Sequence, residues 1–288
     1  MATITVNSIE EFFSATANTN SDTILLGSDL DFNNAPLETS KNIYAGMIDG
    51  QGHKIANLQP LNISINFTLL SFLTTEMTIK NINFENVFHP SGTLFYLGTH
   101  VSFEHNQVSG RCQCTFRGGS TSSNVTKYVR YNAFSFTSIN KMFTGGSGSS
   151  ANWGSAIIEN NYIDLGNCTP TSNTGTDYYI FDLYSGTDYS DLNSFSNNYI
   201  KGKLTPAGSN GQRITRQSST FVKSNCFNVE YTSTVGALYI SGNADASNIY
   251  NTSKATGTVT HTNTTGVTDE QMKNATYLAN NTNFPIST

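Results

Sequence analysis

The stretch Cys168–Leu192 holds the densest group of side chains that could bind or cleave a sugar. It carries tyrosines and aspartates side by side, inside an interval that is longer than its neighbours. Tyrosine rings stack on the CH faces of sugars, carboxylates accept hydrogen bonds from hydroxyls, and paired carboxylates are what glycoside hydrolysis requires. The predicted glycan-binding residues are Trp153, Tyr178, Tyr184, Tyr189, Asp182 and Asp188.

Cleavage is predicted less strongly than binding. Asp182, Asp164 and Glu159 are weak catalytic candidates that could converge on one face. No pattern places one acid in an apolar pocket beside an ionised partner, which hydrolysis would need. We therefore assign no catalytic residue. The alternative for the tyrosine-rich stretch is a solvated loop that covers a strand edge, and Trp153 could equally pack beneath its own Gly/Ser-rich loop, Gly145–Gly154.

A six-residue pattern positions these side chains. It occurs as IENNYI at Ile158–Ile163 and as FSNNYI at Phe195–Ile200. Asparagine tolerates the left-handed backbone of a sharp bend, and its amide can bond to the bend or to another asparagine stacked on it. The pattern therefore predicts a strand that turns a corner. Weaker copies are IKNINF (Ile79–Phe84), FEHNQV (Phe103–Val108), VRYNAF (Val129–Phe134) and VKSNCF (Val222–Phe227).

The spacing of the central asparagines indicates a solenoid. They recur every ~25–37 residues, which is too short for a domain and typical of coils that stack to build a shared core. The asparagines are Asn106, Asn132, Asn161, Asn198 and Asn225. We predict an all-β, single-stranded, right-handed parallel β-helix. The alternative is a β-sandwich in which such pairs arise by chance, against which the regular Val, Ile and Phe positions count.

Helices are predicted to cap both ends of the stack. Ser8 and Glu11 have capping-box spacing before an apolar helical face of Ile9, Phe12 and Phe13, and Thr268 and Gln271 have the same spacing near the C-terminus. We predict one domain over 1–288. It would have an N-terminal strand and cap helix at 1–22, coils at 23–265, and a C-terminal cap helix and tail at 266–288.

Composition excludes several classes of partner. The net charge is −5 and the pI about 5.5, so we expect neither nucleic acid nor an anionic membrane surface as a ligand. No apolar run reaches the length of a membrane span, and the N-terminal sequence predicts no secretory signal. The four cysteines show no zinc pattern and are expected to be reduced or buried; no cofactor and no metal is predicted.

The first coils resemble a known family. The segments Asp22–Leu26 and Gly46–Gly50, followed by Gly52, His53, Ile55, Asn57 and Leu58, look like the opening of pectin-lyase-like β-helix proteins. The resemblance implies the fold and leaves the chemistry open, because that family includes lyases, hydrolases, bacterial adhesins and phage tailspikes. Asp49 and His53 could suggest a catalytic pair, but we interpret this glycine-rich segment as a structural turn.

The resemblance also guides the expected function. The lyase and hydrolase motifs of the family are missing, while a virion protein accounts for both the fold and the missing secretory signal. We expect a phage tail or head fibre or spike that binds host-surface polysaccharide and other virion proteins, as a homo-trimer assembled in the host cytoplasm. The alternatives are a polysaccharide lyase or glycoside hydrolase, and a bacterial adhesin on the extracellular surface.

Overall fold

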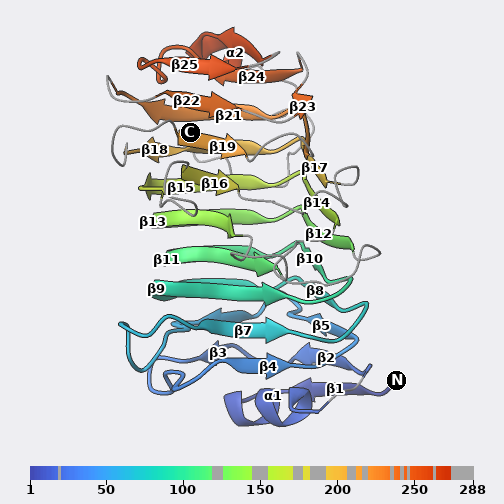
Figure 1. Cartoon of the computed structure of the whole chain (residues 1–288). Helices are drawn as coiled ribbons and strands as arrows, with labels where there is room; N and C mark the ends of the chain where they lie inside the picture. The colour runs from blue at the N-terminus through green and yellow to red at the C-terminus, as the bar shows by residue number, and fades with distance from the viewer. Residues whose placement is uncertain are drawn as a thin grey trace.

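The computed structural model shows a stack of coils that rises from the N-terminal helix to the C-terminal one (Figure 1). Every strand pair in its described ranges is parallel, which confirms the predicted β-helix and rejects the sandwich. The structure describes residues 1–18, 21–118, 126–144, 155–170, 178–181, 193–205, 212–215, 220–233, 237–240, 243–244, 247–261 and 264–273.

One face of the stack is a ten-stranded sheet, named sheet A here. Its strands come one from each successive coil, in chain order. They are β1 (Thr3–Val6), β2 (Thr23–Leu26), β5 (Met47–Asp49), β8 (Thr78–Lys80), β10 (Ser102–Glu104), β12 (Thr126–Arg130), β14 (Ser155–Glu159), β17 (Asn193–Ser196), β20 (Thr220–Lys223) and β23 (Asn243–Ala244).

The second sheet, sheet B, folds around the other two sides of each coil. Its first side holds β3 (Leu30–Asp31), β6 (Lys54–Ala56), β15 (Tyr162–Cys168), β18 (Tyr199–Leu204), β21 (Cys226–Tyr231), β24 (Asn248–Asn251) and β26 (Thr264–Val267). Its second side holds β4 (Lys41–Ile43), β7 (Thr68–Phe72), β16 (Tyr178–Phe181), β19 (Gln212–Thr215), β22 (Leu238–Ile240) and β25 (Val259–His261). The long strands β9 (Asn83–Leu97), β11 (Gln107–Gly118) and β13 (Ala133–Thr144) run through both sides.

A glycine allows the long strand β11 to bend between the two sides. Gly110 has a φ of +138°, and a Cβ at this position would overlap the carbonyl oxygen of Val87 on the neighbouring coil. The pairing of β11 with β13 shifts register directly after it. A β-bulge at a residue without a side chain therefore turns the strand while the stack stays close.

The interior is a continuous column of phenylalanines and aliphatic side chains. Neighbouring rings in the column contact one another, with centroids 4.9 Å apart between Phe84 and Phe95 and 5.9 Å apart between Phe143 and Phe181. The predicted core positions Met77, Ile79 and Ile82 are also buried. Each coil thus completes the apolar floor of the next, as the short repeat requires.

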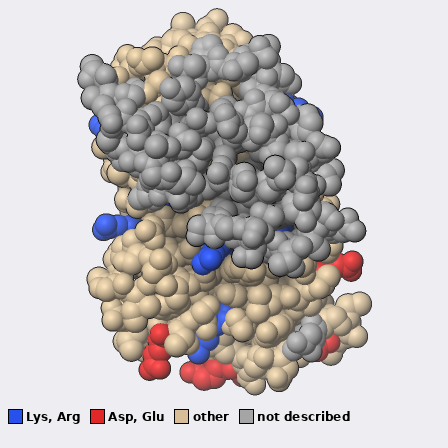
Figure 2. Space-filling view, viewed as in Figure 1, with Lys and Arg blue, Asp and Glu red and all other residues tan. Residues whose placement is uncertain are grey.

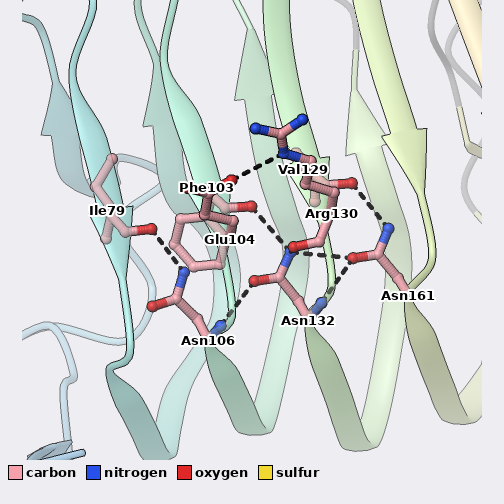
Figure 3. A network of polar contacts seen from close by, with 8 residues as sticks. All are labelled: Ile79, Phe103, Glu104, Asn106, Val129, Arg130, Asn132 and Asn161. Atoms are coloured by element: carbon pink, nitrogen blue, oxygen red, sulfur yellow. Dashed lines mark hydrogen bonds and ion pairs between the residues drawn. The ribbon is translucent and has the colours of Figure 1, made fainter. Parts of the chain in front are cut away.

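The central asparagines form a ladder at the corner between sheet A and sheet B (Figure 3). Asn132 is typical: its Nδ2 donates to the carbonyl of Phe103 on the preceding coil at 2.9 Å, and its Oδ1 accepts from the main-chain N–H of Asn106 at 2.9 Å. The same two bonds recur at each rung, where the side chains are at most 1% exposed. The rungs are Asn106, Asn132, Asn161, Asn198, Asn225 and Asn248, the last of which the motif search missed.

The bend and the ladder use different residues. The left-handed backbone lies at the residue before each rung from Asn106 to Asn225, with φ of +57° at Asn160 and +54° at Asn197. In a pair of asparagines, the first therefore turns the chain and the second bonds to the neighbouring coil. The sequence interpretation had given both roles to one asparagine. At the bend of a weaker copy, Tyr131 takes the same conformation with φ +59°, at a steric cost that a side chain normally avoids.

Both predicted helix caps are present, and the one at Thr268 is a complete capping box. In α1 (Ile9–Thr16), Ser8 Oγ accepts from the N–H of Glu11 at 3.2 Å, while the Glu11 carboxylate accepts from Asn7. In α2 (Asp269–Lys273), Thr268 and Gln271 exchange both bonds, at 3.2 and 2.9 Å. Met272 of α2 is buried in an apolar cluster outside the main core. Residues 274–288 of the predicted C-terminal cap and tail lie outside the described residues.

All four cysteines are free and buried, as predicted. Burial raises the pKa of Cys226 to about 12 and raises those of Cys112 and Cys168 as well. A thiol whose pKa is raised is a poor nucleophile at neutral pH. The cysteines are therefore core residues.

We expect Asn161→Ala to lower the free energy of unfolding by about 2 to 4 kcal/mol, because it leaves the buried N–H of Asn132 and the carbonyl of Val129 without partners. The adjacent Asn160→Gly serves as the matched control and should change stability by about 0.5 kcal/mol or less, since glycine accepts a positive φ. Urea unfolding of the two variants measures this. Equal losses would show that the ladder and the bend contribute alike.

A buried histidine makes stability depend on pH. His89, on β9, is fully buried, and its Nε2 donates to the carbonyl of Phe67 at 2.7 Å. Its Nδ1 is buried and has no hydrogen-bond partner within the described part of the chain. Burial lowers the pKa of His89 below its ordinary 6.5, although the bond to Phe67 acts in the opposite direction.

We expect the contribution of neutral His89 to stability to be complete above pH 6.5 and to be lost as the pH falls through its lower folded-state pKa. His89→Gln keeps a donor for Phe67 and cannot be protonated, so it should remove this part of the pH dependence. Urea unfolding across mildly acidic pH checks it, with the exposed-ring variant His105→Gln as control. If the free energy of unfolding changed with pH equally in wild type and His89→Gln, His89 would not be the source of this pH dependence.

Candidate functional site

Most of the predicted glycan-binding residues cannot be placed. Tyr178 begins β16, but only its backbone is described. The remaining five lie outside the described residues: Trp153, Tyr184, Tyr189, Asp182 and Asp188. Within β16, Ile180 and Phe181 are both fully buried.

The weak catalytic candidates do not form a pair. Glu159 ends β14 on sheet A, whereas Asp164 lies on β15 of sheet B, and the Asn161 corner stands between them. Asp164 is bound to Lys201, with 3.2 Å between Oδ2 and Nζ, and its Oδ1 accepts from the N–H of Gly166. Asp182, the third candidate, lies outside the described residues.

Charged residues of alternating sign form a row along the outer edge of sheet A. Asp49 pairs in register with Lys80, Lys80 with Glu104, Glu104 with Arg130, and Arg130 with Glu159. Two pairs of neighbours in this row form ion pairs: Asp49 with Lys80 at 3.5 Å and Glu104 with Arg130 at 2.8 Å. Opposite charges on adjacent strands cancel, so the row carries little net charge.

Beside this row lies a polar hollow of about 470 Å³, called the corner cleft here. It spans three consecutive coils and is lined mainly by amide side chains, one carboxylate and one imidazole. Its lining residues are Asp49, Gln51, Gly52, Asn81, Ile82, Asn83, His105 and Gln107. None of these is a lysine or arginine, so the cleft offers hydrogen-bond donors and acceptors with a single formal charge.

The carboxylate of the cleft is held ionised. Burial by itself would raise the pKa of Asp49, but hydrogen bonds from the N–H of Gln51 and from Asn81 Nδ2, each 3.0 Å long, and the charge of Lys80 together lower it below 3.8. Asp49 therefore serves as an acceptor, and it cannot act as a proton donor at neutral pH. His53, suggested as its partner, bonds to Asp29 at 3.1 Å instead.

An exposed aromatic pair borders the cleft. His105 and Tyr131 follow the charged row on successive coils and stack with ring centroids 5.1 Å apart and planes 7° from parallel. Tyr131 is 39% exposed, one of few large apolar side chains on the described surface. Both residues have a left-handed backbone conformation. They supply the apolar surface that a sugar ring requires beside hydrogen-bonding groups.

The corner cleft offers a mixed polar and aromatic surface. It combines acceptors, donors and an aromatic edge, which suits polyhydroxylated ligands. The two-carboxylate arrangement of glycosidases is missing from its lining, which has only Asp49. Within the described residues, no group of three or more His, Cys, Asp or Glu side chains gathers as a metal site would require, and no helix is long and apolar enough to cross a membrane.

A signal in the sequence could have identified this edge. The second residue of successive corner motifs is Lys80, Glu104, Arg130 and then Glu159. Aligning the motifs by their asparagines places these residues in one column whose charge alternates, which is expected of cross-strand neighbours. The cleft itself had no such signal, because its residues come from three coils.

The parallel stack and its corner ladder define the class: the fold is a pectin-lyase-like parallel β-helix. Residues 3–129 match the family model of the pectate lyase-like adhesive domain, a stretch that contains the whole corner cleft. Among solved structures, the alginate lyase from Paenibacillus sp. str. FPU-7 is similar, with 12% identity, 92% of this chain and 95% of that chain covered, and a TM-score of 0.48. No curated protein sequence matches the chain.

We expect Asp49→Asn to lower the free energy of unfolding by about 1 kcal/mol at neutral pH, because an amide loses the ion pair with Lys80 and cannot accept with both oxygens. Because the folded-state pKa of Asp49 is lowered, its contribution is present above pH 3.8 and is lost as the pH falls through that lowered value. The two proteins should therefore converge in thermal midpoint at acid pH. A difference that stays constant across the pH series would show that the charge of Asp49 is irrelevant.

Proposed function

We propose that this chain is the carbohydrate-binding part of an attachment protein, and that its corner cleft holds a neutral glycan. The observation that carries this proposal is the lining of the cleft: amides and one ionised carboxylate beside the exposed ring of Tyr131. The match of residues 3–129 to an adhesive-domain family supports adhesion as the use of this surface.

The charges favour a neutral glycan over an acidic one. A polymer of uronic acids would bring carboxylates toward Asp49. The lysine and arginine of the neighbouring charged row already form ion pairs within the chain. Lys80 is paired with Asp49, and Arg130 with Glu104. Among the described residues on the face drawn in Figure 2, the lysines and arginines lie apart from one another. Like charges in contact would cost binding energy.

Binding fits the site better than bond cleavage. General acid catalysis needs a group that still carries its proton near neutral pH, and the hydrogen bonds of Asp49 act against this. Glycan binding needs only exposed rings and preformed polar groups. Gln51 and Gln107 are exposed at the rim of the cleft and can contact a ligand without disturbing the coil.

The attachment protein would be carried either by a phage particle or by a bacterial surface. A tail or head fibre or spike of a phage particle, which binds host-surface polysaccharide and other virion proteins, would use the cleft as described. A bacterial surface adhesin would use it in the same way, and the adhesive-domain match favours this second setting. Purification of phage particles or of cell envelopes, followed by immunoblotting for this chain, separates the two.

Gln51→Ala and Gln107→Ala should each weaken binding of a neutral glycan about fivefold, because each removes a side-chain hydrogen bond worth about 1 kcal/mol. A glycan array containing neutral and uronate polysaccharides identifies the ligand, and calorimetry on the best neutral ligand gives the affinities. Gln113→Ala is the matched control, because Gln113 lies on the same strand β11 and is not among the residues of the cleft.

The same samples are assayed for new reducing ends and for unsaturated ends. We expect neither. Affinity that is unchanged in both cleft variants would reject the cleft as the site, and preferential binding of uronate polymers would reject a neutral glycan as the ligand. Cleavage that Asp49→Asn abolishes while binding survives would make the protein a depolymerase.

A further inference from the structure

One loop exposes apolar side chains that the fold does not use. Between β6 and β7, Leu61, Ile63 and Ile65 are 61%, 49% and 45% exposed. Among the described residues, these are three of the five large apolar side chains that are exposed, the others being Met1 and Tyr131. We call residues 61–67 the apolar loop. A cluster of this kind on an otherwise polar surface marks an interaction site.

The apolar loop is held in place at both ends. The N–H of Leu61 donates to the carbonyl of Leu37 at 2.7 Å, and the carbonyl of Phe67 accepts from His89 and from the N–H of Thr93. Between these anchors, Asn62 Oδ1 accepts from the N–H of Ser64 at 3.0 Å. The side chains are therefore presented on a preformed backbone, so a partner need not pay for ordering it.

The surroundings of the loop carry no charge along the chain. From Ile55 to Thr75 the sequence contains no Asp, Glu, Lys or Arg. Around a rotation axis, a residue near the axis meets its own copies, so any charge there would face the same charge. An uncharged segment is free of this repulsion. The loop is thus suited to contact itself, whereas a charged partner would find no complementary group on it.

We propose that the apolar loop is a homotypic contact, at which a second copy of this chain packs Leu61, Ile63 and Ile65 against its own. This contact is independent of the corner cleft and of the glycan it holds. It gives the predicted homo-oligomer a location on the chain. Joining copies in this way would also present several clefts to one surface, which raises the overall affinity for a polyvalent glycan without new sugar contacts.

A lipid surface is the competing occupant, and the charges count against it. Basic residues strengthen the attachment of apolar loops to anionic membranes. The nearest charge along the neighbouring segment is the acidic Glu38, which directly follows Leu37, and Lys54 is ion-paired with Glu85. The loop therefore lacks a cationic flank.

The test is sedimentation velocity of the full chain over a range of micromolar concentrations. Wild type should form an oligomer, and the triple variant Leu61→Ser, Ile63→Ser, Ile65→Ser should be monomeric. Tyr131→Ser, which removes another exposed large side chain at the corner, should leave the oligomer unchanged. Circular dichroism checks that each variant is folded. These side chains are exposed on the single chain, so each variant should keep the far-UV spectrum of the wild type.

A second pair of variants keeps the proposal testable if the triple variant fails to fold. Ile63→Lys and Ile63→Glu should each be monomeric, and mixing the two should restore association. A monomeric wild type, an oligomer that survives the triple variant, or the failure of the mixture to associate would each overturn the proposal. Flotation with phosphatidylcholine vesicles that requires the loop would assign it to a lipid surface instead. Glycan binding by the monomeric triple variant would show that the corner cleft functions without this contact.

Discussion

The structure depends on one repeated pair of hydrogen bonds at the corner of each coil. A corner interrupts the sheet, so a main-chain N–H and a carbonyl on the preceding coil would be buried without partners. The amide of an asparagine supplies both missing groups at once, and stacked asparagines do so through the coils from Asn106 to Asn248. The cost of leaving such groups unpaired explains why these side chains are so completely buried.

The ladder also fixes what lies next to it on the surface. Because each rung locks the register of its coil, the residues two positions before Asn106, Asn132 and Asn161 align into the part of the row from Glu104 to Glu159. The residue immediately before each rung from Asn106 to Asn225 adopts a left-handed backbone, and at two of these positions His105 stacks on Tyr131. An interaction that stabilises the core thus arranges polar and aromatic groups along a line outside it, and the corner cleft lies on that line.

Variation between coils is confined to the segments that leave the sheets. The ladder interval grows to 37 residues between Asn161 and Asn198, yet their side chains still meet at 2.9 Å. The apolar loop is an enlargement between β6 and β7, where the next coil has the continuous strand β9. Stacking tolerates such insertions because only the strands must match their neighbours. Recognition surfaces can therefore differ from coil to coil without cost to the core.

The sequence by itself determined the fold, because its signals are local or periodic. The asparagine spacing indicated the coils, Ser8 and Thr268 marked the helical caps, and both were confirmed. Only the tertiary structure decided the site. Asp49, Asn81 and His105 belong to three coils, and their meeting depends on how far each coil advances in register, which no single motif encodes. Glu159 and Asp164 lie close in sequence but on different sheets, because the chain turns a corner between them.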